Sequence, residues 1–320
     1  MPTLSQLNYI VAVDRFRHFG KAAKHCKVSQ PSLSIQIQKV EEELDTVLFD
    51  RNKKPVLPTS SGAGFIEQAK RVLREHEKLL SYMHSQAHVI GGSFSIGIIP
   101  TVLPYLLPLF VQDFLSEYPH IDLSVEEMKT VDIIEALKAD HIDAGILATP
   151  LKEEGIREMQ LYCEDFLIYY NKSHAISSQK DTLLASDLEA LHPSDLWLLK
   201  DGHCLRNQVT QLCSSQGGQT VLGRFSFEGG SLETLRTLIR ATSGYTLIPR
   251  SFALSLSNKE LRECTKEFAP PVPVREISIV YAREQWKKDH IKALAKTVKN
   301  SIPKPLMSKQ GTNTEVIGID

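Results

Sequence analysis

Over the first sixty residues, hydrophobic side chains recur every three or four positions, a spacing that predicts short helices. We expect helices over residues 4–13, over FGKAAKHC (19–26) and over QPSLSIQIQKVEEEL (30–44). Small residues in the second segment, a tight turn and a longer amphipathic third segment are typical of a helix-turn-helix. Ser29 or Gln30 can cap the third helix, since both precede its apolar stripe.

The third segment has one apolar face and one polar face. Its polar face carries Ser32, Gln36 and Lys39, where a recognition helix would meet base edges and phosphates. The following segment DRNKKPVLPTSSG reads as a short hairpin, or wing, that would hold the DNA backbone through its basic side chains, Arg51, Lys53 and Lys54. A plain three-helix domain with a solvated polar face is the alternative from spacing alone.

A longer helix is expected from residue 62 to residue 88. Its apolar positions alternate four and three apart, as in a coiled-coil seam, at Phe65, Ala69, Val72, His76, Leu79 and Met83. We therefore expect a dimerisation helix, with a lone amphipathic helix packed on its own protein as the alternative.

After residue 90, strand-like and helix-like segments alternate. Strands are expected at residues 94–99, 121–127, 143–148, 166–170, 196–199, 224–227, 245–249 and 276–282. Helices are expected at residues 104–118, 131–140, from residue 204, at 231–241 and near 285–300. Such alternation predicts parallel sheets with helices on their faces. The aperiodic end, residues 303–320, is expected to be mobile.

Composition narrows the function classes. The chain has 320 residues, a net charge of −1 and five cysteines. The sequence shows neither a signal-peptide pattern nor a long apolar run, so we expect a soluble, cytoplasmic protein without membrane contact. No Cys/His spacing suits zinc, and no catalytic triad, phosphate-binding glycine loop or carboxylate pair is evident, so no metal, cofactor or enzyme activity is expected.

The stretch DGHCLRNQVTQLC places two cysteines nine positions apart on one expected helix. Cys204 opens the helix beside His203 and Arg206, and both cations and helix N-termini favour a thiolate. Cys213 has no cation within four positions. This asymmetry suggests an attacking and a resolving thiol, while two ordinary buried thiols remain the alternative. Arg206 could stabilise the reduced thiolate or join the oxidised network.

The segment FGKAAKHCKVSQPSLSIQIQKVEEELDTVLFDR resembles the DNA-binding segment of LysR-type transcriptional regulators, including V-S-Q-P-S-L-S and the L-F-x-R exit. The resemblance implies a winged helix-turn-helix at residues 1–61, a linker helix at 62–90 and a two-lobed α/β regulatory domain, like a periplasmic binding protein, at 91–302. It also implies that the groove is met by Gln30, Pro31, Ser32, Ser34 and Gln36.

DGHCLRNQ, the second cysteine and the downstream SLETLR resemble the OxyR branch of that family, whose members sense hydrogen peroxide. This likeness implies a reversible Cys204–Cys213 disulfide. It further implies that peroxide is bound and polarised by Thr101, Thr130 and His203. Two departures are Asn207, where an acidic residue is common, and Glu228 ahead of the shared SLETLR motif.

The expected function is therefore a redox-responsive activator of antioxidant genes that binds a double-stranded DNA operator. The family likeness implies a homodimer or homotetramer that acts through RNA polymerase. A LysR-type regulator that binds a small metabolite between its lobes is the second hypothesis. A thiol peroxidase is the third, although it would leave the DNA-binding segment unexplained.

Overall fold

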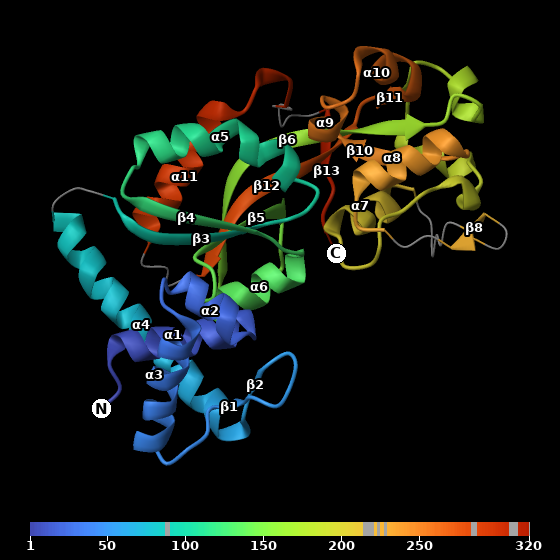
Figure 1. Cartoon of the computed structure of the whole chain (residues 1–320). Coiled ribbons are helices and arrows are strands. Elements are labelled where there is room, and N and C mark those ends of the chain that lie inside the picture. Colours follow the sequence, from blue (N-terminus) through green and yellow to red (C-terminus); the bar gives the residue numbers. More distant parts are fainter. Residues whose placement is uncertain are drawn as a thin grey trace. The chain divides into compact units, whose positions relative to one another are not determined.

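The computed structural model describes residues 1–86, 90–213, 221–222, 225–226, 229–282, 287–306 and 313–319. The chain divides into two compact units, Met1–Val89 and Ile90–Asp320. The first is built of helices with a small hairpin, and the second is an α/β domain (Figure 1).

The N-terminal unit is a winged helix-turn-helix, as the sequence predicts. Its elements are α1 (Leu4–Phe16), α2 (Phe19–His25), α3 (Gln30–Glu43), the hairpin β1 (Phe49–Asp50) and β2 (Leu57–Pro58), and α4 (Ser60–Gln86). Ser29 is the residue that caps α3, because its side chain accepts a hydrogen bond from the Ser32 amide at 3.3 Å. The apolar stripe of α3 packs against α1 and α2, with Leu33, Ile37 and Val40 fully buried.

The helix α4 is the expected long linker helix. Near its start, Ile66 and Ala69 are buried, and Lys70 forms an ion pair of 3.0 Å with Asp14 of α1. Further along, Val72 and Leu79 expose 47% and 61% of their surface. The apolar positions of α4 are therefore only partly covered within its own unit.

The second unit contains one large mixed sheet, with strand order β4-β3-β5-β12-β6-β11-β7; β10 also pairs with β6, and β13 with β12. Its strands are β3 (Gly92–Ile98), β4 (Ile121–Glu127), β5 (Ala144–Thr149), β6 (Ile156–Tyr170), β7 (Thr182–Leu183), β10 (Tyr245–Pro249), β11 (Thr265–Phe268), β12 (Val272–Ala282) and β13 (Thr314–Val316). A separate small hairpin pairs β8 (Val221–Leu222) with β9 (Phe225–Ser226).

The expectation of parallel sheets is only partly correct. β3 pairs in parallel with β4 and β5, but β12 is antiparallel to β5 and β6, and β10 and β11 are antiparallel to β6. Helices alternate with strands in the sequence, yet β12 runs opposite to β3, β4 and β5, whereas β6, being antiparallel to β12, runs in the same direction as those three strands. Both β6 and β12 are long strands that extend through the two lobes.

Each lobe has its own hydrophobic core. The first half of β6 lies in the first-lobe core and its second half in the second-lobe core. The helices are α5 (Leu103–Glu117), α6 (Thr130–Lys138), α7 (Cys204–Leu212), α8 (Leu232–Ala241), α9 (Arg250–Ala253), α10 (Asn258–Cys264) and α11 (Lys288–Ser301). In the first lobe, α5 and α11 cover one face of the sheet and α6 the other (Figure 1).

Two further expectations differ from the structure. Residues 196–199 form no strand; only Leu196 makes an isolated bridge, to Tyr245. The C-terminal end is ordered where it is described: β13 pairs with β12 and the Ile317 side chain is 4% exposed. Burial of one apolar side chain and backbone pairing to an existing strand order this segment without any periodic pattern. Residues 224 and 227 of the expected strand 224–227 lie outside the described residues, and so does Glu228, the second departure from the family pattern.

Candidate redox site and DNA-binding surface

The two cysteines singled out by the sequence lie at opposite ends of α7. Cys204 is the first residue of the helix and Cys213 its C-cap, whose amide donates to the Val209 carbonyl at 3.0 Å. At about 1.5 Å of rise per residue, nine positions separate the Cα atoms by roughly 13 Å. A disulfide needs them within about 7 Å. Neither cysteine is in a disulfide, and helical α7 keeps the two sulfur atoms apart.

The two thiols also lie in different hydrophobic cores. Cys204, 7% exposed, packs with the first-lobe core, whereas Cys213, 4% exposed, packs with the second-lobe core. Burial raises the pKa of Cys213 to about 12, and a hydrogen bond with Tyr245 partly opposes this. Cys213 is therefore a protonated thiol at neutral pH and, in this buried state, a poor nucleophile.

His203 precedes Cys204 and is also buried. Burial lowers the pKa of His203, and the nearby Lys129 charge lowers it further, so the imidazole is neutral at pH 7. A Cβ on Gly230 would lie 3.1 Å from its Nε2, and the Lys200 amide donates to the Gly229 carbonyl at 2.8 Å. The loop before α8 thus closes tightly over this imidazole, which only glycine at position 230 allows without displacement.

Arg206 is held by the loop that precedes α7. Its Nη1 donates to the Leu199 carbonyl at 2.8 Å, and its Nε lies 2.6 Å from the Asp201 carboxylate. These contacts fix the start of α7 to residues 199–201, and the two roles that the sequence left open for Arg206 stay predictions.

Thr101 and Thr130 are both buried, in different surroundings. The Thr101 hydroxyl accepts a hydrogen bond from Arg275 Nη1 at 3.1 Å. Thr130 is the first residue of α6, and its hydroxyl has no hydrogen-bond partner within the described part of the chain. Buried hydroxyls are normally paired, so an unpaired one is suited to a small polar ligand.

First-lobe and second-lobe loops meet beside this hydroxyl. Lys129 lies directly before Thr130, and its Nζ lies 3.5 Å from the Asp201 carbonyl oxygen. A Cβ on Gly202 would be 3.4 Å from the same side chain. The start of α6 and the start of α7 therefore face each other, and they bring Thr130 toward the segment that carries His203 and Cys204.

Sequence analysis missed a fully buried charge pair in the regulatory domain. Arg275 of β12 and Glu164 of β6 are fully buried, are register partners and form an ion pair of 2.8 Å. Glu164 also accepts from the Ser251 amide at 2.7 Å. A charged residue within the apolar run VPVREISIV was the available signal, since such a residue needs a buried partner.

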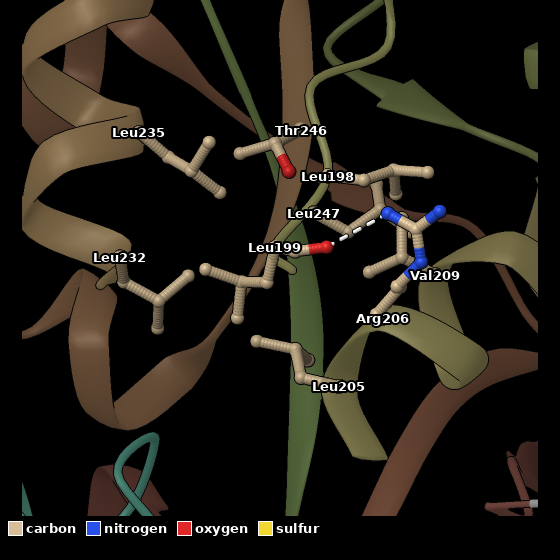
Figure 2. A pocket seen from close by; sticks show the side chains of 9 residues that line it. All are labelled: Leu198, Leu199, Leu205, Arg206, Val209, Leu232, Leu235, Thr246 and Leu247. Atoms are coloured by element: carbon tan, nitrogen blue, oxygen red, sulfur yellow. Dashed lines mark hydrogen bonds between the residues drawn. The ribbon is translucent and has the colours of Figure 1, made fainter. Parts of the chain in front are cut away.

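An apolar crevice of about 170 Å³ lies between α7, α8 and β10 (Figure 2). It is lined by Leu198, Leu199, Leu205, Arg206, Val209, Leu232, Leu235, Thr246 and Leu247. No water molecule fits inside, and ligand pockets are usually above about 300 Å³. The crevice is a packing seam along which the apolar face of α7 rests.

The expected DNA-binding residues separate into a first group that is exposed to solvent and a second group that makes contacts within the N-terminal unit. Gln30, Pro31, Ser32, Lys39, Lys53 and Lys54 are exposed, and Ser34 and Gln36 are partly exposed. Gln36 accepts a hydrogen bond from Gln6 of α1 at 3.1 Å. Arg51 donates to Ser34 at 3.1 Å and to Glu41 at 2.7 Å, and its guanidinium lies 5.2 Å from the Phe19 ring. Arg51 thus fastens the hairpin to α3, whereas the first group is open to a duplex.

Within the described residues, no group of three or more His, Cys, Asp or Glu side chains could hold a metal ion. No helix of the described chain is both long and apolar enough to cross a bilayer.

Comparison with known proteins gives matches along nearly the whole chain. Residues 4–63 match the bacterial regulatory helix-turn-helix protein model of the lysR family, and residues 87–302 match the LysR substrate binding domain. A hydrogen peroxide-inducible genes activator of Haemophilus influenzae is 33% identical over 93% of this chain and 97% of its own.

Solved structures agree with this assignment. A full-length cysteine-to-aspartate variant of Pseudomonas aeruginosa OxyR superposes with a TM-score of 0.69, at 29% identity, over 93% of this chain and 98% of that one. A cysteine-to-serine variant of Corynebacterium glutamicum OxyR, described as bound to H2O2, gives a TM-score of 0.63 at 28% identity over 98% of both chains.

Proposed function

This chain belongs to the LysR family of bacterial regulators, and we propose that it activates transcription in response to hydrogen peroxide through a reversible Cys204–Cys213 disulfide. The observation that carries the proposal is the placement of two buried cysteines, neither of them in a disulfide, at the two ends of one nine-residue helix, each in a different core. The names of the similar proteins support peroxide as the signal.

The chemistry requires two steps. The Cys204 thiolate attacks one peroxide oxygen, the O–O bond breaks, and Cys204 becomes a sulfenic acid while the second oxygen takes a proton and leaves as water. The Cys213 sulfur then attacks the sulfenic sulfur, so that the S–S bond forms and a second water leaves. Two thiols and one peroxide give one disulfide and two waters, and the thiols supply both electrons.

Three polar groups are proposed to hold the peroxide. Thr130 offers an unpaired hydroxyl, and the neutral imidazole of His203 can donate at one nitrogen and accept at the other. Thr101 contributes a hydroxyl that is held by Arg275. Charge moves between the two oxygens as the bond breaks, and donors already in place stabilise the leaving oxygen.

The disulfide would convert oxidation into a change of shape. Because helical α7 separates the thiols by roughly 13 Å, several residues between 205 and 212 must leave helical geometry before the bond closes. Leu205 and Val209 would then leave the apolar crevice, and Cys213 would leave the second-lobe core. A local covalent event is thereby transmitted to the packing of a whole lobe.

We propose that the switch acts by changing how the protein binds DNA. The exposed polar face of α3 and the basic hairpin suit a double-stranded operator. The exposed Val72 and Leu79 of α4 suit a homodimer, which would pair into a homotetramer and contact RNA polymerase. Because the proposed partners are an operator and RNA polymerase, we also propose that the protein is cytoplasmic. One peroxide consumed per disulfide is detection, so we do not propose an enzyme.

Peptide mapping without reductant tests this function. The purified protein receives an equimolar pulse of peroxide, and its peptides are compared with those of Cys204→Ser, Cys213→Ser and the control Cys163→Ser, while footprint length on the operator is followed in parallel. We expect a Cys204–Cys213 peptide in the native and Cys163→Ser proteins only, reversed by dithiothreitol and accompanied by a changed footprint.

Other outcomes would redirect the proposal. If both thiols stay free, or bond without any effect on the footprint, a metabolite between the lobes becomes the better explanation. Peroxide consumption far above one equivalent would indicate a thiol peroxidase.

A further inference from the structure

The C-terminal segment, residues 313–319, adds a strand to the regulatory domain. β13 pairs in parallel with β12, from Val272 opposite Thr314 to Val274 opposite Val316. The Val272 amide donates to Asn313 at 2.8 Å, and the Ile317 amide donates to Val274 at 2.9 Å. This segment is thus anchored on one of the two long strands that the lobes share, and it ends beside α7 (Figure 1).

Two side chains of α7 hold the backbone of this segment. Gln208 is completely buried, and its Nε2 donates to the Ile317 carbonyl at 2.9 Å. Asn207 donates to the Ile319 carbonyl at 3.2 Å. Both residues lie between the two cysteines, so they belong to the part of the helix that has to rearrange.

The same segment also contacts both cores. Ile317 is part of the second-lobe core, while Ile319 packs against the first-lobe core. The Gln208 Oε1 atom has no partner within the described residues, so the bond to Ile317 is the interaction that offsets the burial of this amide. Unwinding α7 would leave the Gln208 amide and the Ile317 carbonyl to find new partners.

We propose that residues 313–319 form a latch on the redox helix, and that Gln208 is the positioning residue through which the latch sets the rate and equilibrium of Cys204–Cys213 disulfide formation. The inference rests on the proposed function. The latch acts on the second step, because Gln208 is in the segment that unwinds, and leaves the attack of Cys204 on peroxide unchanged.

Gln208→Ala tests the latch, with Gln211→Ala as the matched control. Both change glutamine to alanine on the same helix, but Gln211 is exposed. Alanine is the better helix former, so any gain in helix propensity would oppose unwinding in both variants. We expect Gln208→Ala to close the disulfide about fivefold faster, since a hydrogen bond of typical strength is lost, while Gln211→Ala remains near the native rate.

Three measurements distinguish loss of the Gln208–Ile317 contact from a general destabilisation of the regulatory domain. The rate of sulfenic acid formation, measured in a Cys213→Ser background, should be the same with and without Gln208→Ala. In glutathione buffers, the ratio of disulfide to dithiol should rise about fivefold in Gln208→Ala. Ile317→Ala should act in the same direction, and combining it with Gln208→Ala should give less than the product of the two effects, because both release one contact.

The outcomes are distinguishable from failure of the switch itself. If the native protein forms no Cys204–Cys213 disulfide, the proposed function fails. If it does, but Gln208→Ala and Gln211→Ala oxidise alike and share one glutathione equilibrium, the latch is wrong.

Discussion

Burial keeps the Cys213 thiol unreactive in the folded protein. The thiol is buried in the second-lobe core and hydrogen-bonded to the tyrosine, and burial dominates, so its pKa is about 12. Only the thiolate attacks sulfur or carbon efficiently. Cys213 therefore becomes reactive when α7 opens, which orders the two steps of oxidation.

Alkylation of the reduced protein tests this protection. At pH 8 a thiol of pKa about 12 is about one part in ten thousand thiolate, so iodoacetamide should leave Cys213 unmodified in the folded protein and label it after unfolding in guanidinium. Tyr245→Phe removes the bond that lowers the pKa, so labelling at pH 10 should become slower still. The partly exposed Cys26 serves as the internal control and should react earlier. Native labelling of Cys213 at the unfolded rate would contradict the assignment.

Among the elements, α8, α10 and β6 are joined by one carboxylate. Glu260 of α10 accepts from Arg236 of α8 at 2.6 and 2.8 Å and from the Tyr169 hydroxyl at 2.6 Å. The Arg236 bonds are the main cause of a Glu260 pKa lowered to about 2. Because the folded pKa lies below the unfolded one, this stabilisation is present above pH 5 and is lost as the pH falls toward 2.

Glu260→Gln should therefore destabilise the domain at pH 7 by about 2–3 kcal/mol, with a difference that shrinks as pH falls to 3. Urea unfolding at both pH values measures this. Glu263→Gln is the matched control, since Glu263 pairs with Lys172 at the surface of the same helix and should leave the midpoint unchanged. An equal loss at pH 3 and pH 7 would show that packing, not charge, is responsible.

Elements with local periodicity were predictable, whereas those defined by distant partners were not. The strands Ile121–Glu127 and Tyr245–Pro249 have the expected bounds, because short apolar or alternating runs end at clear turn residues. β6 begins at Ile156, ten positions before the expected start, since its first residues include the exposed polar side chains of Arg157, Glu158 and Gln160, which nevertheless pair with β12. β13 has no sequence pattern at all and depends on that same strand.

The same distinction between local patterns and distant partners holds for the redox site. The cysteine pair and its place on a helix could be predicted from local spacing. The partners of Arg275, Tyr245 and Gln208 could not, because they lie 174, 32 and 109 positions away in the chain. Burial, which sets the Cys213 pKa and makes the Glu164–Arg275 pair necessary, arises only when β6 and β12 meet.

At the scale of the whole molecule, the two lobes share strands but the two units do not. β6 and β12 cross from one lobe toward the other, and the Arg275–Glu164 pair lies where they are register partners. In the N-terminal unit, the buried Glu41 accepts from the Leu48 and Phe49 amides and from Arg51. We expect the two lobes to unfold together, and the N-terminal unit to unfold separately.

Calorimetry of two matched variants tests this division. Glu164→Gln leaves Arg275 charged and buried without its counter-ion, which typically costs 3–5 kcal/mol, or roughly 10 °C in the transition of a unit of this size. The loss should appear in the larger transition alone and should not split it, since both lobes depend on the same strands. Glu41→Gln should instead lower only the smaller transition. If Glu164→Gln resolves two transitions within the regulatory domain, the lobes fold independently, and oxidation in one could not reshape the other through these strands.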